Sequence, residues 1–169
     1  RRSDTAPIGF NDSQRFSRSD LASAFLLPAN CLRDAKGPDD MENSSAMRFR
    51  GLRGATTAND NSADAILAAT RELLERLMAR NHLAVADIAS AFFTVTDDLD
   101  TAYPALAARE LGWNEVALLC AREIPVPGSV GRCIRVLLHI NTTMGQRDLR
   151  HVYLREAAAL RPGFADTAS

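Results

Sequence analysis

The sequence predicts a single α+β domain, close to α/β in pattern, in which two helices lie on one face of a mixed five-stranded sheet. The main observation is the order of its patterns, because strand-length apolar runs alternate with helical periodicity along the last two thirds of the chain. A second observation is size, since 169 residues suit one domain with a sizeable core. A third is composition, with 46% hydrophobic and 24% charged residues, as in ordinary globular proteins.

The first helix is expected over residues 63–80, where the periodicity is clearest. Apolar side chains recur there at a spacing of 3.6 residues, and charged side chains fill the opposite face. Asn61 or Ser62 is expected to accept a hydrogen bond from a free N–H at the start of this helix. Asn81 and His82 are expected to end it.

A second, shorter helix is expected over residues 104–111. Asp98 or Asp100 is the expected cap, and Pro104 is tolerated in the first turn of a helix. Gly112 is expected to end the helix, because glycine readily adopts the left-handed conformation that follows a last turn.

Five segments have the composition and length of strands. They comprise residues 47–56, 91–95, 114–123, 132–142 and the alternating segment that begins at residue 152. The third and fourth are apolar on nearly every residue, which is typical of strands covered on both faces. Two helices can cover only one face of the sheet, so we expect subunit association to cover the other.

The first 46 residues differ from the rest of the chain. They are mostly polar, interrupted by glycine and proline and without a hydrophobic period. We therefore expect residues 1–46 to be a disordered extension or a leader added by an over-extended reading frame. The functional domain is expected to span residues 47–162, followed by a tail over residues 163–169.

Charge and cysteine usage limit the possible partners. The net charge of −1 gives the chain no overall field that would attract nucleic acid or an anionic membrane, and no apolar run reaches the ~20 residues of a membrane span. The three cysteines, Cys31, Cys120 and Cys133, are odd in number and lack C-x-x-C spacing. This pattern indicates a reducing compartment and argues against a zinc site. We therefore predict a cytoplasmic protein that uses neither nucleic acid, membrane nor metal.

Polar side chains interrupt the apolar strands and point to an anionic ligand. They are Arg50, Arg53, Glu123, Arg135, Tyr153 and Arg155, with Arg109 at a helix end. A buried guanidinium stays charged and needs an anion or several acceptors. Because Glu123 is the main acid among these strands, the excess of arginine favours a ligand with carboxylates.

Ordinary structural roles remain open for each of these residues. Glu123 and Arg135 could form a cross-strand ion pair, and Tyr153 could belong to the core or to an interface. The sequence contains no G-x-x-x-x-G-K or G-x-G-x-x-G motif and no nucleophile beside a base. Residue chemistry alone therefore predicts a binder of small anions.

Five blocks of sequence occur in the order and spacing of a known family. They are "RGLRGATT", "ILAATRELLERL", "AYPALAARELG", "CAREIPVPGSVGRCIRV" and "RHVYLREAAALRP". Over about residues 47–162 the chain resembles the AroH class of chorismate mutases. The resemblance implies a cytoplasmic homotrimer with a barrel-like centre of sheets, helices outside and active sites between neighbouring subunits. It also implies an isomerase of the shikimate pathway, which converts chorismate to prephenate for phenylalanine and tyrosine synthesis without a cofactor.

The resemblance implies a role for each polar strand residue. Arg135 would face the ether oxygen of the breaking C–O bond and a carboxylate. Glu123 would accept a hydrogen bond from the substrate hydroxyl and orient Arg135. Arg53 and Tyr153 would hold a carboxylate, and Cys120 would lie near the hydroxyl.

Three more positions complete the implied substrate site. Tyr103, where the family commonly has phenylalanine, would pack on the ring, and Arg109 and Leu160 would close the cleft. Leu106 stands where a lysine is common, which removes one charge from the cleft edge. Two other functions compete with the mutase: a non-catalytic trimer that binds a small carboxylate or acts as a regulatory partner, and a YjgF-like deaminase trimer with a similar barrel.

Overall fold

A computed structural model describes residues 46–164 of the chain. Its elements in chain order are β1 (Arg48–Thr57), α1 (Ala63–Asn81), η2 (Val85–Asp87), β2 (Ile88–Val95), α2 (Ala105–Glu110), β3 (Ala117–Arg122), β4 (Cys133–Thr142), β5 (Val152–Tyr153), η3 (Arg155–Leu160) and η4 (Pro162–Phe164). The extension predicted over residues 1–46, apart from its last residue, and most of the predicted tail lie outside the described residues. Cys31 lies outside them as well.

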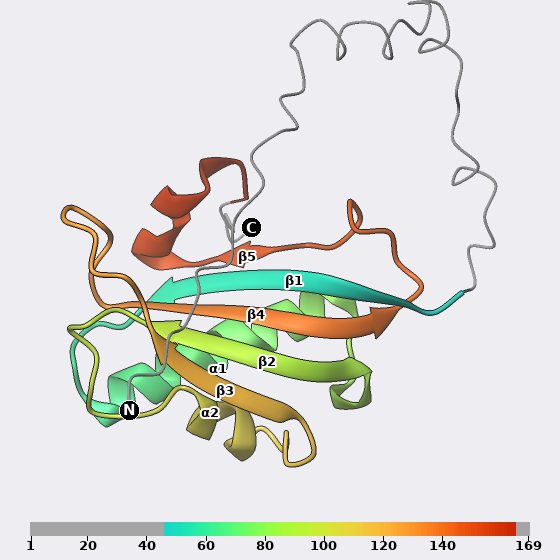
Figure 1. The fold of residues 1–169 in the computed structure, drawn as a ribbon, viewed down its shortest axis with the longest axis horizontal. Helices are drawn as coiled ribbons and strands as arrows, with labels where there is room; N and C mark the ends of the chain where they lie inside the picture. The colour runs from blue at the N-terminus through green and yellow to red at the C-terminus, as the bar shows by residue number, and fades with distance from the viewer. Residues whose placement is uncertain (1–45, 165–169) are drawn as a thin grey trace, which may run out of the picture. The chain divides into compact units, whose positions relative to one another are not determined.

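The five strands form one mixed sheet in the order β3-β2-β4-β1-β5. Strand β4 lies at its centre and pairs antiparallel with both β1 and β2, whereas β2–β3 and β1–β5 are parallel pairs. Both α-helices lie on the same side of the sheet (Figure 1). The predicted fold class and the predicted order of strands and helices are therefore confirmed.

Helix α1 forms where the sequence period predicts it. Ser62 caps its start by accepting a hydrogen bond from the Ala65 N–H, and His82 ends it in the left-handed conformation with φ 51°. Asn61, the other candidate cap, instead donates to Asp100. The buried face of α1 packs on the sheet through the side chains of Leu73, Leu74 and Leu77, which belong to the main hydrophobic core.

The cap predicted for the second helix is wrong. Helix α2 starts at Ala105 after Pro104, with no side-chain cap. Asp98 is occupied elsewhere, because it accepts hydrogen bonds from the Arg132 N–H and the Thr96 hydroxyl. Asp100 accepts from Asn61. Gly112, with φ 86°, follows the helix as predicted.

The last strand is shorter than its alternating sequence suggests. Strand β5 has two residues, and the chain then turns at Arg155, which has φ 53°, into η3. The Arg155 guanidinium donates to the Thr57 carbonyl at 2.8 Å and pairs with Glu72 at 2.7 Å. This arginine is therefore balanced within the fold and does not belong to the positive excess that the sequence suggests.

The two faces of the sheet differ in cover. The face under the helices carries the core side chains Leu52, Phe93, Val136 and Leu138. The other face, here called the open face, bears exposed apolar side chains at Phe49, Phe92, Leu119 and Leu137. Their exposed fractions of 36–58% leave this face without the cover that the sequence calls for.

No helix in the described part of the chain combines the length and hydropathy needed to cross a bilayer.

Gly54 permits close packing of α1 on β1, which gives a test of the helix–sheet contact. A Cβ at this position would lie 2.7 Å from Leu77 Cδ1 and 3.1 Å from Leu73 Cδ1. We expect Gly54→Ala to lower the free energy of unfolding by about 1–3 kcal/mol, because overpacking strains a filled core. Urea unfolding at fixed protomer concentration measures this loss. Gly163→Ala is the control, since its Cβ would meet nothing within 4 Å; equal losses in both variants would contradict the packing argument.

Candidate active site

One row of residues crosses four strands at the end of the sheet. In the strand register, Thr94 of β2 lies opposite Arg135 of β4, Arg135 lies opposite Ala55 of β1, and Ala55 lies opposite Tyr153 of β5. Strand β4 is rich in isoleucine, valine and leucine, so it suits the buried centre of a sheet. Strands β1 and β2, which pair with β4 on either side, therefore hold the backbone of Arg135 in place.

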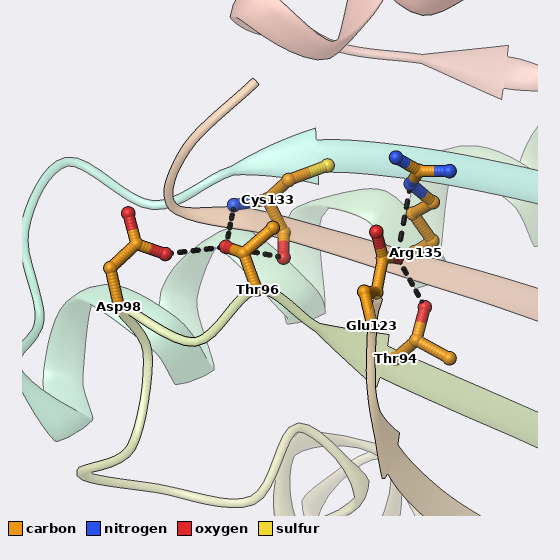
Figure 2. A network of polar contacts seen from close by, with 6 residues as sticks. All are labelled: Thr94, Thr96, Asp98, Glu123, Cys133 and Arg135. Atoms are coloured by element: carbon orange, nitrogen blue, oxygen red, sulfur yellow. Dashed lines mark hydrogen bonds and ion pairs between the residues drawn. The ribbon is translucent and has the colours of Figure 1, made fainter. Parts of the chain in front are cut away.

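Glu123 reaches this row from the end of β3. Its backbone N–H donates to the Val95 carbonyl at 2.9 Å, which fixes the chain just beyond the strand. Its Oε1 lies 3.0 Å from Arg135 Nε and accepts a hydrogen bond of 2.6 Å from the Thr94 hydroxyl. Figure 2 shows the carboxylate between these two side chains. The sequence-predicted pair Glu123 and Arg135 thus meets in space.

Arg135 opens into a hollow of about 600 Å³ on the open face. Of the residues predicted for substrate binding, Arg53, Tyr153 and Leu160 also line it. The lining residues that sequence reasoning missed include Phe92, Thr94 and Arg161. Phe92 and Thr94 gave no signal, because such residues are ordinary in a strand. Arg161 could have been found, because it directly follows Leu160 in the block "RHVYLREAAALRP".

The charge of this hollow is one-sided. Among the described residues, its lining contains three arginines, Arg53, Arg135 and Arg161, and no carboxylate. Glu123, which lies behind Arg135 with 13% of its side chain exposed, offsets part of that charge. The hollow is therefore suited to a ligand with more than one negative charge.

The other predicted residues lie elsewhere on the chain. Tyr103, Arg109 and Cys120 line a second hollow of about 640 Å³, between α2 and the edge strand β3. Leu106 lies there too, so this hollow lacks the lysine that the family commonly has. Among the described residues, none lines both hollows. A single chain therefore does not bring all of the predicted site residues together.

The thiols near the site are protonated. Burial raises the pKa of the Cys120 thiol, and burial likewise raises the pKa of Cys133 despite the neighbouring Arg135. Cys133 packs in a small core with Ala55, Tyr153 and Ala157. The prediction that Cys133 is a small buried hydrophobe is therefore confirmed. Cys120 is half-buried. Neither thiol is activated as a nucleophile.

A polar anchor fixes the start of β4, two residues before Arg135. The Thr96 hydroxyl accepts from the Cys133 N–H at 2.9 Å and donates to Asp98 at 2.5 Å. Asp98 also accepts from the Arg132 N–H at 2.8 Å. Figure 2 shows the Thr96–Asp98 part of this anchor beside the Glu123–Arg135 pair. Partial burial alone would raise the pKa of Asp98, but these two hydrogen bonds hold it below its ordinary value of 3.8.

In the part of the chain that the structure describes, no three His, Cys, Asp or Glu side chains lie close enough together to hold a metal ion.

Comparison with known proteins identifies the family of the chain. Residues 49–164 match the family model for chorismate mutase type I. The chain belongs to this family. The match thus covers the sheet, apart from the first residue of β1, and both α-helices, and the resemblance found in the sequence is confirmed.

Individual relatives agree with this assignment. The chain is 52% identical to the chorismate mutase AroH of Thermus thermophilus over 114 residues, which are 67% of this chain and 93% of the relative. It is 39% identical to the chorismate mutase AroH of Bacillus subtilis strain 168 over 122 residues, which are 72% of this chain and 96% of the relative. A solved structure of chorismate mutase from Clostridium thermocellum matches with a TM-score of 0.64 and 51% identity, covering 64% of this chain and 97% of that one.

The Asp98 anchor predicts a pH-dependent part of the stability. Because the pKa of Asp98 is lower in the folded state, its contribution is complete above pH 3.8 and is lost as the pH falls through the folded pKa. We expect Asp98→Asn to lower the free energy of unfolding by about 1 kcal/mol at pH 7, from the weakened hydrogen bonds. Denaturant unfolding from pH 7 to pH 3, at fixed protomer concentration, should show this difference shrinking below pH 3.8. A difference that stays constant to pH 3 would contradict the role of the Asp98 charge.

Proposed function

We propose that this chorismate mutase rearranges chorismate to prephenate in the arginine-lined hollow, with Arg135 as the main catalytic residue. The observation that carries the proposal is the lining of this hollow, which among the described residues includes three arginines and no Asp or Glu, while Glu123 pairs with Arg135 from behind. Chorismate has two carboxylates and a hydroxyl, so its charge matches that lining. Membership of the type I chorismate mutase family supports the same reaction.

The reaction is an intramolecular pericyclic step, so the protein contributes geometry and charge. The substrate must be held in its compact shape while the ether C–O bond lengthens and the oxygen gains negative charge. Arg135 has a fixed backbone, its side chain is 42% exposed, and it lines the hollow. A guanidinium in that place stabilises the developing charge without reorganisation during the reaction.

The residues around Arg135 have roles in substrate binding that follow from their positions. Arg53 and Tyr153 hold a substrate carboxylate, and Leu160 borders the same hollow. Glu123 accepts a hydrogen bond from the substrate hydroxyl and orients Arg135 through the 3.0 Å ion pair. A bidentate contact between a carboxylate and the forked Arg53 guanidinium fixes the direction of the substrate as well as its affinity.

The second hollow completes the site in a homotrimer. Tyr103, Arg109 and Cys120 would come from a neighbouring subunit, because in one chain they line a different hollow from Arg135. The exposed apolar side chains of the open face support such an assembly, since burying them removes apolar surface from water. The active site then lies between subunits. A cytoplasmic location follows from the cysteine usage and stays a prediction.

A chorismate assay tests the function, and Arg135→Lys tests its mechanism. We expect the purified protein to consume chorismate and form prephenate, followed by absorbance and by product analysis. Arg135→Lys keeps the charge but loses the planar fork. Turnover should fall ~100- to 1000-fold, as when one donor to a developing oxyanion is removed.

Arg71→Lys is the matched control for this substitution. Its side chain is also 42% exposed, but it pairs with Glu110 on the outer surface of the helices. It should leave turnover within about 2-fold of the parent protein, since exposed ion pairs contribute little. Absence of chorismate consumption by the folded trimer would favour a non-catalytic carboxylate-binding protein. If the parent protein consumes chorismate and Arg135→Lys loses no turnover, the role of Arg135 is contradicted but the proposed reaction is not.

The trimer proposal predicts the effect of a charge on the open face. Phe49, which is 58% exposed in one chain, would be buried between subunits. We expect Phe49→Glu to give monomers in analytical ultracentrifugation and to reduce turnover at least 10-fold, because an unpaired charge is costly to bury. The control Ala79→Glu places the same charge on the exposed side of α1 and should keep both mass and turnover. An active monomer in Phe49→Glu would contradict a site shared between subunits.

A further inference from the structure

We propose that Thr94 is a positioning residue for the reaction, which sets the orientation of the Glu123 carboxylate and through it that of Arg135. This inference rests on the proposed function and adds a residue that the sequence gives no reason to select. Thr94 belongs to β2, and its backbone pairs with Ala121 of β3 on one side and Arg135 of β4 on the other. Thr94 therefore lies between β3, which leads to Glu123, and β4, which carries Arg135.

Thr94 makes the best-defined contact of the Glu123 side chain. Its hydroxyl donates to Oε1 at 2.6 Å, the length typical of a hydrogen bond from a hydroxyl to a charged carboxylate. Arg135 Nε lies 3.0 Å from the same oxygen, but its N–H is not aligned with that oxygen as a hydrogen bond requires. The ion pair supplies attraction with little direction. The hydroxyl supplies the direction, so Thr94 decides where the carboxylate points.

The two contacts divide the oxygens of Glu123 between support and substrate. Both Thr94 and Arg135 approach Oε1, and within residues 46–164 Oε2 has no hydrogen-bond partner. Oε2 is therefore the oxygen available to the substrate hydroxyl. If the Thr94 hydroxyl were absent, the carboxylate could rotate about its last side-chain bond, because terminal carboxylate torsions are broad. Oε2, the acceptor for the substrate, and Oε1, the contact of Arg135, would then both lose their fixed positions.

The needs of strand β2 do not by themselves explain a threonine at position 94. Threonine is a common strand former, and valine would satisfy the backbone of β2 equally well. The hydroxyl is the part that valine lacks, and it donates to the Glu123 carboxylate, which contacts Arg135. Thr94 also borders the arginine-lined hollow, which is the site proposed for the reaction.

The test compares Thr94→Val with Thr94→Ser in the trimeric protein, using chorismate turnover. Valine keeps the shape and removes the donor. We expect kcat to fall about 10-fold, with KM within about 2-fold, because a hydrogen bond to a charged group contributes at about that level. Serine should restore kcat to within about 2-fold of the parent protein. Thr70→Val is the control, since it removes a buried hydroxyl that donates to the Ile66 carbonyl within α1, and kcat should be unchanged.

A double-mutant cycle with Glu123 separates positioning from a direct effect. If Thr94 acts through the carboxylate, Thr94→Val should cause no further loss in a Glu123→Ala background, so the two losses will not add. Equal losses in both backgrounds, a parent-like kcat in Thr94→Val, or a failure of serine to restore kcat would each overturn the inference. Thr94→Ala replaces Thr94→Val if the valine variant does not fold. A parent protein that does not consume chorismate would instead overturn the proposed function.

Discussion

A guanidinium held on the central strand of the sheet, with one acid behind it, is the constraint on which the site depends. Arg135 has no neutral form at working pH, so the fold must either pair it or leave it facing an anion. The structure does both: Glu123 approaches Nε, while the rest of the guanidinium faces the hollow. Neighbouring strands on both sides of β4 fix the backbone, so the charge keeps its position when substrate arrives.

The same sheet creates a second constraint, because its helices cover only one face. Core side chains such as Leu52 and Leu138 pack under α1, whereas Phe49 and Leu137 on the other face remain exposed in one chain. An uncovered apolar face favours association. The proposed active site along that face would link assembly to catalysis, since the subunits that cover the sheet would also supply the second hollow. Stability and function would then depend on one interface.

The sequence predicts the fold better than it predicts the site. The periods of α1 and the strands depend on local side-chain patterns, which the order of elements in the structure confirms. The pairing of Glu123 with Arg135 was also predictable, because both lie in one recognisable block. Asp98 was wrongly assigned to α2, since a carboxylate can serve any nearby N–H and only the fold brings Arg132 within reach. Thr94 had no sequence signal, because its partner is 29 residues away and its strand pattern is ordinary.

A reaction without proton transfer makes no demand on the two thiols or on His151. Burial keeps the thiols of Cys120 and Cys133 protonated, and burial together with Arg53 and Arg161 lowers the pKa of His151. These groups are therefore uncharged near neutral pH and compete with no arginine for the substrate carboxylates. A pericyclic rearrangement transfers no proton, so it needs none of these groups as an acid or a base and relies on the fixed positive charge of the arginines.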